Sequence, residues 1–341
     1  MRNIGILTGG GDSAGINAVL WSIQTRAQKH GWQVSGIRNG WGGLLEGDIR
    51  PLPKELYRFW DQPGTLLGTS RVNPLADSDG GIAKIVEILE AHNITDLIAI
   101  GGDDTLSVAA ELSKAGVPVV GIPQSIDNDI AGTEYALGFG TACRQISTCI
   151  SSMRQSNISH KRGMLVEVMG RESGWLALYA AASSYAQALL IPEVPYSLSR
   201  FGSKLVELTK ENPAPLVIVS EGISQSHLKL SLDEVDPFGN PRLEGGVYQL
   251  GSYLKDEWNL NFRIQILGFQ QRGGITDYRD TIYAALFAKK ALELISADDT
   301  GYLVGVHSNK AAAVPLQDVV GKKRLVESTH LQMVSGILGI K

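Results

Sequence analysis

Four aspartates fall in two short segments of the chain that could do chemistry together. Gly101-Gly102-Asp103-Asp104-Thr105 and Pro123-Gln124-Ser125-Ile126-Asp127-Asn128-Asp129 each follow an apolar run typical of a buried strand. Carboxylates this close together repel one another, and a hard cation is the simplest group that would offset the repulsion. Mg²⁺ takes one or two carboxylates plus waters and phosphate oxygens, which leaves another carboxylate to orient or deprotonate a hydroxyl. Two such loops in succession favour a phosphoryl-transfer site over two solvated loops with helix-capping aspartates.

A glycine-rich turn near the start of the chain is a second candidate for binding phosphate. Residues Gly9 to Gly15 join an expected strand, Ile4 to Thr8, to an expected helix, Ile16 to His30. The backbone N–H groups of such a turn can bind an anion. The turn also fits a relaxed dinucleotide fingerprint, but no Asp or Glu lies between Ala14 and Leu45 to bind a ribose. The lysine-containing P-loop motif is absent too, so a dinucleotide oxidoreductase and a P-loop NTPase are both disfavoured. A tight turn without a ligand remains the simpler alternative.

Five arginines lie in glycine-rich or strand-end contexts where they could bind phosphate, namely Arg71, Arg162, Arg171, Arg263 and Arg272. Arginine makes bidentate, charge-assisted bonds to phosphate, each worth ~1.5–3 kcal/mol. Any one of them alone is more typical of a surface ion pair. Together with the acidic loops they fit phosphoryl transfer, in which positive charge meets both the moving and the anchoring phosphate.

The elements that must position these residues alternate between apolar strands and amphipathic helices. We expect further strands at 33–37, 96–100, 117–122, 163–169, 216–220 and 263–267, and helices at 80–92 and 175–188. This rhythm predicts an α/β protein with two Rossmann-like, three-layer lobes and mainly parallel sheets. Ligands bind beyond the carboxyl ends of the strands in such sheets, which is where the glycine- and acid-rich segments fall.

Length and composition limit the classes of protein that the chain can be. Its 341 residues fit two lobes of one enzyme subunit. The net charge of −4 offers no general attraction for nucleic acid or an anionic membrane, and no apolar run is long enough to span a bilayer. The two cysteines, Cys143 and Cys149, are too few for a disulfide framework and do not form a zinc motif. We expect a cytoplasmic protein.

The motifs together resemble the ATP- and pyrophosphate-dependent 6-phosphofructokinase family over nearly the whole chain. Besides the glycine turn and the two acidic loops, the resemblance rests on segments in family order, namely Leu67-Gly68-Thr69-Ser70-Arg71, Val166-Glu167-Val168-Met169-Gly170-Arg171, Ser220-Glu221-Gly222 and Gln271-Arg272-Gly273-Gly274. Trp41 to Asp48 and Thr69 to Pro74 look most like the actinobacterial-type branch. The resemblance implies a donor lobe of residues 1–138 plus about 271–321 and a sugar lobe of 139–270 plus about 322–341. It implies a phosphotransferase with Mg²⁺ as cofactor, acting on the 1-hydroxyl of fructose 6-phosphate.

The resemblance also implies a role for each residue in the transfer step. Asp127 would take the proton from the sugar hydroxyl, while Asp103 and Asp129 would help to place Mg²⁺. The moving phosphoryl group would be stabilised by Gly11, Arg71 and Arg171, and bound by the hydroxyl of Ser125. The residues that would bind the donor are Gly11, Arg71, Gly102, Asp103, Asp104, Thr105 and Gln124.

A second set of residues would bind the sugar. Met169 and Glu221 would contact the sugar itself, and Arg162, Arg263 and Arg272 would hold its 6-phosphate. The full set expected around the substrate is Ser125, Asp127, Asp129, Arg162, Met169, Gly170, Arg171, Glu221, Arg263, Phe269 and Arg272. The arginines that match Arg162 and Arg263 reach in from a neighbouring subunit in this family, which implies a dimer or tetramer with shared sites.

Two positions depart from the family pattern. Asp104 stands where ATP-using members have glycine, so it would repel the α-phosphate of a nucleotide and favours pyrophosphate. Users of pyrophosphate, however, pair this aspartate with a lysine at the position of Gln124, so ATP stays open as the donor.

Phe269 stands where the family has histidine or tyrosine beside the 6-phosphate. Losing that hydrogen bond could cost ~1.5–3 kcal/mol, so a less highly charged group, such as the sulfonate of 6-deoxy-6-sulfofructose, is an alternative to the phosphate. The simpler alternative is that Phe269 merely packs and that the three arginines suffice. A non-catalytic sugar-phosphate sensor on the same fold is a further alternative, which the presence of Asp127 and Arg171 disfavours.

Overall fold

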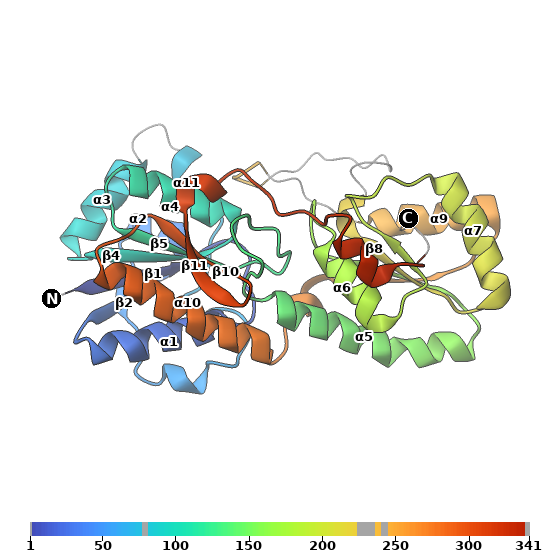
Figure 1. Cartoon of the computed structure of the whole chain (residues 1–341), viewed down its shortest axis with the longest axis horizontal. Helices are drawn as coiled ribbons and strands as arrows, with labels where there is room; N and C mark the ends of the chain where they lie inside the picture. Colours follow the sequence, from blue (N-terminus) through green and yellow to red (C-terminus); the bar gives the residue numbers. More distant parts are fainter. Residues whose placement is uncertain (1, 77–80, 224–235, 240–244, 338–341) are drawn as a thin grey trace. The chain divides into compact units, whose positions relative to one another are not determined.

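The computed structural model describes residues 2–76, 81–223, 236–239 and 245–337 (Figure 1). The chain divides into two compact units, each built from several stretches of sequence. The larger unit consists of Met1–Thr141, Val235–Asn240 and Arg272–Arg324. The smaller unit consists of Ala142–Glu234, Pro241–Gln271 and Leu325–Lys341.

A seven-stranded sheet in the order β11-β10-β5-β4-β1-β2-β3 forms the centre of the larger unit. Its strands are β1 (Asn3–Thr8), β2 (Gln33–Ile37), β3 (Ile49–Pro51), β4 (Asp96–Gly101), β5 (Val119–Pro123), β10 (Tyr302–His307) and β11 (Lys310–Pro315). The five central strands are parallel, and β3 and β11 pair antiparallel at the two edges. The carboxyl ends of β1, β4 and β5 therefore lie next to one another along one edge of the sheet.

Helices cover both faces of this sheet (Figure 1). On one face α1 (Ile16–Lys29) packs beside α10 (Tyr278–Ser296), and the other face carries α2 (Gly40–Glu46), α3 (Gly81–Ala91), α4 (Asp103–Lys114) and α11 (Leu316–Val319). Strand β4 shows the cause, because its side chains alternate between the two faces. Ile98 and Ile100 belong to the core beneath α1 and α10, whereas Leu97 and Ala99 belong to the core on the opposite face. Short 3₁₀ turns lie at Leu56–Arg58 and Pro74–Ala76.

The smaller unit has a parallel four-stranded sheet in the order β7-β8-β6-β9. Its strands are β6 (Met164–Val168), β7 (Ala188–Leu190), β8 (Leu216–Ser220) and β9 (Arg263–Ile266), and its helices are α5 (Phe139–Ser159, which begins in the larger unit), α6 (Trp175–Ser184), α7 (Leu198–Glu211) and α9 (Gly246–Trp258). Helices α7 and α9 share one core with the sheet, and α6 packs against β7 and β8. Short 3₁₀ turns occupy Glu221–Ile223, Gly268–Arg272 and His330–Val334.

The expected α/β fold with mainly parallel sheets is confirmed, and β2 and β8 have the predicted bounds. The helix predicted at 175–188 is too long. It ends at Ser184 because Tyr185 adopts a left-handed conformation with φ 51°, and Ala188 already begins a strand. The expected start of another helix at Gly80 lies outside the described residues, and α3 is seen from Gly81.

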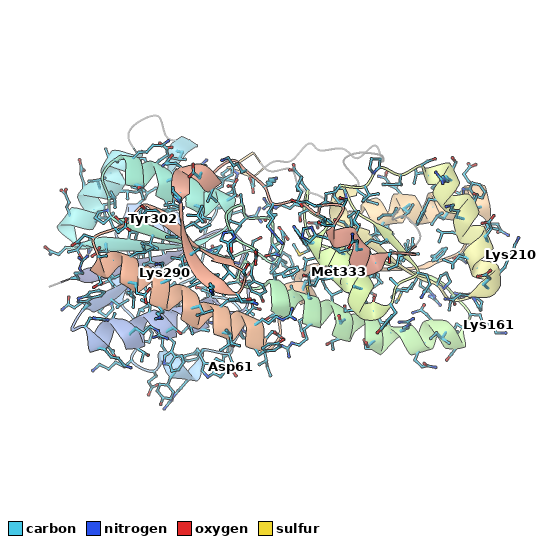
Figure 2. The ribbon with its side chains drawn as sticks, viewed as in Figure 1. Asp61, Lys161, Lys210, Lys290, Tyr302 and Met333 are labelled. Carbon is cyan, nitrogen blue, oxygen red and sulfur yellow. The ribbon has the colours of Figure 1, made fainter. Side chains whose placement is uncertain are left out.

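Two further findings concern the class of protein. Within the described part of the chain, no helix combines the length and the apolar character needed to cross a bilayer. Cys143 and Cys149, both on α5, are free thiols. Figure 2 shows the described side chains on the ribbon, and among those labelled is Asp61, whose carbonyl accepts hydrogen bonds from the backbone and the hydroxyl of Thr276.

Candidate active site

The glycine turn and both acidic loops lie side by side at the carboxyl edge of the larger sheet. They follow β1, β4 and β5, which are neighbours in the sheet. Backbone hydrogen bonds continue the sheet into the loops, since Gly9 N–H donates to the Ile100 carbonyl at 3.0 Å and Gln124 N–H donates to the Gly101 carbonyl at 3.0 Å. The fold thus brings together three segments that are far apart in the sequence, as the motif positions predicted.

Thr105 locks the first two of these loops together. A Cβ placed on Gly9 would lie 2.4 Å from the Thr105 hydroxyl, and a Cβ on Gly101 would lie 2.5 Å from it. Glycine is therefore required at both positions by this close approach. Thr105 itself is only 1% exposed. Its burial supports a structural role between the loops, and its expected contact with the donor stays a prediction.

The loop after β5 holds Asp127 through a local turn. The Ser125 hydroxyl accepts a hydrogen bond from the Asp127 N–H at 3.2 Å and is 3.5 Å from a carboxylate oxygen of Asp129. Asp127 is buried. Gln124, expected to face the donor, is 2% exposed and donates its amide to the Ser13 hydroxyl at 2.9 Å. Its side chain is thus turned into the interior, and Ser13, which the sequence analysis did not single out, is its partner.

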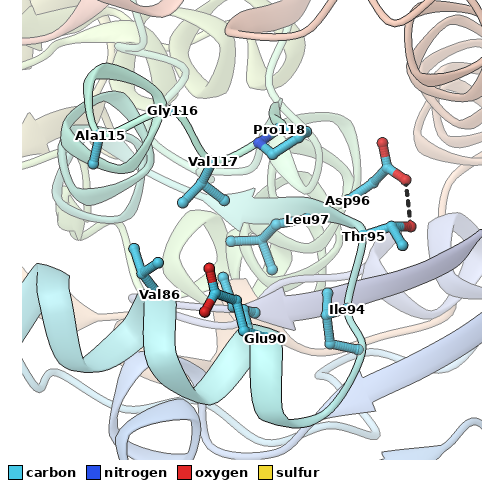
Figure 3. A pocket seen from close by; sticks show the side chains of 11 residues that line it. Val86, Glu90, Ile94, Thr95, Asp96, Leu97, Ala115, Gly116, Val117 and Pro118 are labelled. Carbon is cyan, nitrogen blue, oxygen red and sulfur yellow. Dashed lines mark hydrogen bonds between the residues drawn. The ribbon is translucent and has the colours of Figure 1, made fainter.

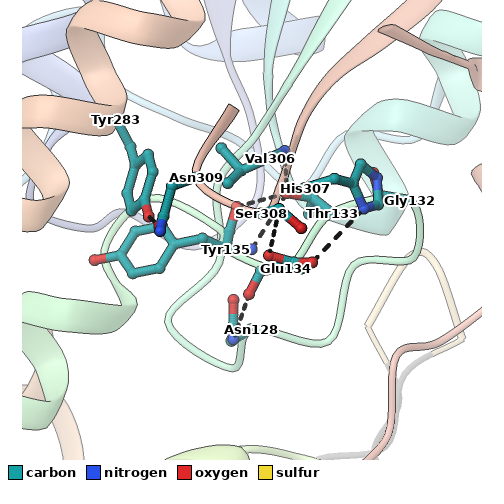
Figure 4. A network of polar contacts seen from close by, with 10 residues as sticks. All are labelled: Asn128, Gly132, Thr133, Glu134, Tyr135, Tyr283, Val306, His307, Ser308 and Asn309. Carbon is teal, nitrogen blue, oxygen red and sulfur yellow. Dashed lines mark hydrogen bonds and ion pairs between the residues drawn. The ribbon is translucent and has the colours of Figure 1, made fainter. Parts of the chain in front are cut away.

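A polar network that begins at Asn128, the residue after Asp127, fixes the course of this loop (Figure 4). Asn128 accepts a hydrogen bond from Ala136 N–H at 2.8 Å, and its amide reaches the Glu134 carbonyl at 3.4 Å. Thr133 accepts the N–H of Val306 on β10 at 3.0 Å. Asn128 has φ 54°, a conformation that asparagine tolerates better than most residues. The network therefore ties the acidic loop to residues 134–136 and ties this segment, through Thr133, to β10.

Asp280, a residue that sequence reasoning missed, anchors the end of the same loop. Its carboxylate is completely buried on α10 and accepts four hydrogen bonds, from the Tyr135 hydroxyl (2.9 Å), Gly138 N–H (2.8 Å), Thr141 N–H (2.8 Å) and the Thr141 hydroxyl (2.6 Å). Burial raises the pKa of Asp280, and these four bonds lower it again in part. No sequence signal marked Asp280, because only the fold brings α10 against residues 135–141.

The acidic residues suit a hard cation such as Mg²⁺. Burial raises the pKa of Asp103, and the Gly321 N–H and the Lys323 ammonium offset part of this rise. In the described ranges, no three His, Cys, Asp or Glu side chains gather closely enough to hold a metal by themselves. Mg²⁺ needs only one or two carboxylates when phosphate oxygens and waters complete its shell. Asp103 and Asp129 fit that requirement as oxygen ligands.

Two arginines approach the loops of the larger unit. Arg272 lies against the glycine turn and donates to the Asp12 carbonyl at 2.7 Å, while its expected contact with the 6-phosphate of the sugar stays a prediction. A Cβ on Gly11 would be 2.6 Å from its guanidinium, so a side chain there would displace the flexible end of Arg272. Arg71 is exposed, and one of its terminal nitrogens is 3.2 Å from a carboxylate oxygen of Asp236.

In the smaller unit, Glu221 shapes the turn that carries Arg171. One of its carboxylate oxygens accepts the N–H of Gly170 at 3.2 Å and the N–H of Arg171 at 2.9 Å. Arg171 has φ 48°, a left-handed conformation that costs free energy and persists only where the surroundings enforce it. The Met169 N–H donates to the buried Gln271 side chain at 3.1 Å. Gln271 thus joins the expected sugar loop to the 3₁₀ turn at 268–272, a role that its place in a family motif did not reveal.

Arg162 and Arg263 lie at the other edge of the four-stranded sheet. Arg263 is the first residue of β9 and pairs with Met164, the first residue of β6, while Arg162 comes just before β6. Arg171 and Glu221 follow the carboxyl ends of β6 and β8 instead. Within its own unit, the chain therefore separates these two exposed arginines from the sugar loops.

Phe269 is 83% exposed. The idea that it merely packs is therefore not supported within the described part of this chain, and its ring is available to a ligand or to another molecule.

One cavity of ≈ 190 Å³ lies well away from these loops (Figure 3). It is lined by the end of α3, the start of β4 and the turn after α4, including Glu90, Leu97 and Pro118. Leu97 N–H donates to the Pro118 carbonyl at the amino ends of β4 and β5. This cavity is therefore at the opposite edge of the sheet from the acidic loops and does not belong to the candidate site.

The fold and the loops together are those of an α/β phosphotransferase. The sequence profile of the family described as phosphofructokinase matches residues 3–295. The chain belongs to the phosphofructokinase family.

Relatives across this family differ in the phosphoryl donor that their names give. The chain is 36% identical to the pyrophosphate–fructose 6-phosphate 1-phosphotransferase of Amycolatopsis methanolica, covering 95% of this chain and 96% of that protein. It is also 36% identical to the ATP-dependent 6-phosphofructokinase of Mycobacterium bovis, covering 98% of this chain and 99% of that protein. The solved pyrophosphate-dependent phosphofructokinase of Marinobacter aquaeolei superposes with a TM-score of 0.84 at 20% identity, covering 100% of this chain and 89% of that one, which supports the fold alone.

Proposed function

We propose that this chain is a magnesium-dependent phosphotransferase that moves a phosphoryl group from pyrophosphate to the 1-hydroxyl of fructose 6-phosphate. The observation that carries the proposal is the position of Asp127 in an anchored turn at the carboxyl edge of the larger sheet, one strand away from Asp103 and two from the glycine turn. Relatives with these loops are named for this transfer with either donor. The presence of Asp104 favours pyrophosphate over ATP.

The residues of the chain would divide the reaction between them. Asp127 would accept the proton of the sugar hydroxyl, which makes that oxygen a better nucleophile. The Gly11 backbone, Arg71 and Arg171 would bind the charge that spreads over the moving phosphoryl group. The Glu221 carboxylate would hold Arg171 in the conformation that this task requires.

Asp103 and Asp129 would hold Mg²⁺, which when bound neutralises charge on the phosphate oxygens. The turns at Gly11 and Gly102 would approach the donor closely, because neither has a side chain to exclude it. Gly11 is in addition the point where Arg272 packs on the turn, so this arginine would add positive charge on the donor side.

We also propose that two copies of the chain share each sugar site. Arg162 and Arg263 are exposed and lie at the sheet edge opposite to Arg171. A second copy could present these two arginines to the 6-phosphate, which supports a dimer or tetramer. Such an enzyme would act in the cytoplasm, where its two free thiols remain reduced.

The test is direct turnover with purified protein. The protein is given Mg²⁺ and fructose 6-phosphate with pyrophosphate or ATP in parallel, and fructose 1,6-bisphosphate is measured. We expect fructose 1,6-bisphosphate to form with pyrophosphate, and a metal chelator to abolish its formation. Product with ATP alone would refute the choice of donor, and a folded oligomer that is inactive with both would refute the acceptor.

A second acceptor, 6-deoxy-6-sulfofructose, is favoured by the exposed Phe269 ring. Phenylalanine offers no hydrogen bond to an anion, and a sulfonate carries less charge than a phosphate and needs fewer donors. The kcat/KM values for the two acceptors, measured side by side with the same donor, decide between them. A Phe269→His variant should shift the ratio toward fructose 6-phosphate by about tenfold if this position reads the anion.

A further inference from the structure

The loops expected to bind the donor contain no lysine, but a lysine from another segment of the chain lies close to them. This inference rests on the proposed function and concerns how the donor is held. Gln124 offers no positive charge, and its buried amide is already bonded to Ser13. Asp104, on the neighbouring strand end, adds negative charge beside a donor that is itself a polyanion. A further cation beside Asp104, in addition to the arginines already named, would offset this charge.

The segment Gly321–Arg324 supplies the framework for such a cation. It runs antiparallel to the acidic loop after β5, with Lys323 bridged to Ile130. Arg324 N–H donates to the Asp129 carbonyl at 2.7 Å, and its guanidinium donates to the Asn128 carbonyl at 3.1 Å. The backbone of this segment is thus fixed directly against the loop that carries Asp127 and Asp129.

The same segment also touches the other acidic loop. The Gly321 N–H is hydrogen-bonded to Asp103, two residues before the bridge that pairs Lys323 with Ile130. Lys323 is exposed, so its ammonium can meet a ligand from solvent. One short segment therefore bridges both acidic loops and carries an accessible cation beside the first.

We propose that Lys323 binds the phosphoryl donor, taking the place of the positive charge that Gln124 does not provide. The ammonium would contact the phosphate that is not transferred, beside Asp103 and Asp104. This contact would favour inorganic pyrophosphate, because both of its phosphates are highly charged and unesterified. The lysine ammonium is a compact charge on a flexible four-carbon chain, so it can adjust its position to bind such a phosphate.

Lys322 provides a matched control. It is adjacent, exposed and equally charged, but its backbone N–H bonds to the Val319 carbonyl in the turn after α11, whereas Lys323 is bridged to Ile130. Lys322→Gln therefore removes the same charge from the same segment without removing the group beside Asp103. Lys323→Arg keeps the charge and should keep most of the affinity.

The experiment measures binding of magnesium pyrophosphate by calorimetry to the full-length protein and to the three variants, without any sugar. Loss of one charge-assisted contact is expected to weaken binding by about tenfold to a hundredfold in Lys323→Gln. Lys322→Gln should bind as the wild type does, and the KM for fructose 6-phosphate and the melting temperature of Lys323→Gln should be unchanged. These results would support the assignment.

Three results would overturn it. The first is unchanged pyrophosphate binding in Lys323→Gln, and the second is an equal loss in Lys322→Gln, which would indicate only the general field of the surface. The third is a wild-type protein that binds no pyrophosphate. Pyrophosphate binding that depends on Lys323, without turnover of fructose 6-phosphate, would refute the proposed function and leave this inference intact.

Discussion

A single carboxylate oxygen of Glu221 accepts the backbone N–H of Arg171 at 2.9 Å and that of Gly170 at 3.2 Å. Arg171 needs this support because its φ of 48° is unfavourable for a residue with a side chain. Two residues that follow different strands thus form one structural unit, in which the acid fixes the turn that carries the arginine. Glu221 is therefore a positioning residue in addition to its expected contact with the sugar.

Two variants can separate the hydrogen bonds that Glu221 accepts from the effect of its negative charge. Glu221→Ala removes both acceptor contacts and should lower kcat/KM for the sugar by at least about tenfold. Glu221→Gln keeps an oxygen acceptor and should recover part of that loss. Equal losses in the two variants, measured by steady-state kinetics, would show that the negative charge matters and that the hydrogen bonds to the turn do not.

If Asp127 is the base, its removal should reduce turnover without reducing the affinity for the sugar. Asp127→Ser should reduce kcat by about 10²–10⁴-fold, because the proton of the sugar hydroxyl then has no positioned acceptor. Sugar binding, measured by equilibrium titration, should change little. Near-normal turnover in this variant would exclude Asp127 as the base.

Shared sites predict that two inactive variants restore each other. Arg171→Ala and Arg263→Ala should each be inactive alone. If the two arginines of a site come from different copies, a mixed dimer contains one intact site, and random exchange of subunits should recover about a quarter of the wild-type activity. The measurement is turnover after the two proteins are unfolded and refolded together, with each refolded alone as the control. No recovery despite proven mixing would place both arginines of a site on one copy.

The ion pair between Arg71 and Asp236 predicts competition with the donor. A carboxylate 3.2 Å from Arg71 opposes the approach of a phosphate to the same guanidinium. Since Arg71 is more than half exposed, the pair is weak, and Asp236→Asn should lower the donor KM by only about two- to fivefold. Asp298→Asn, which alters an arginine pair with Arg2 outside the loops, serves as the control. A higher donor KM in Asp236→Asn would mean that Asp236 orients Arg71 productively.

Asp280 makes a prediction about stability. Asp280→Asn leaves donors such as Thr141 N–H without a suitable acceptor and should lower the free energy of unfolding by about 2–4 kcal/mol in urea titrations. Asp277→Asn, at the N-cap of the same helix, should be nearly neutral because asparagine also caps. A wild-type-like Asp280→Asn would show that the buried carboxylate contributes little.

The pH dependence of this effect has a definite sign. Because burial raises the pKa of Asp280 above its value in the unfolded chain, the folded state binds the proton more tightly. The contribution of Asp280 to stability is then full below about pH 4 and decreases as the pH rises through the folded-state pKa. The difference between wild type and Asp280→Asn should therefore be smaller at pH 8 than at pH 5. A larger difference at pH 8 would mean that the four hydrogen bonds outweigh burial.

The residues alone were enough to predict the class of fold, the family and the loops that are expected to carry the chemistry. Buried apolar strands and amphipathic helices have local signatures, and the glycine and aspartate motifs fall directly after the strands that hold them. Parallel pairing then requires that those loops meet at one edge of the sheet. For this reason the order of residues along the chain is enough to group the glycine turn with Asp103 and Asp127.

The side chains that support the loops became evident from the contacts between distant segments of the fold. Thr105 and Gln124 carry polar groups that suit a donor, yet both side chains are buried between loops. Their burial could not be predicted locally, because it depends on contacts between distant segments. Arg272 lies on the glycine turn, and Lys323 reaches the acidic loops from a segment about two hundred residues away in sequence. Local pattern cannot encode such contacts, since they arise when β10, β11 and α11 return the chain to the edge of the sheet where β5 ends.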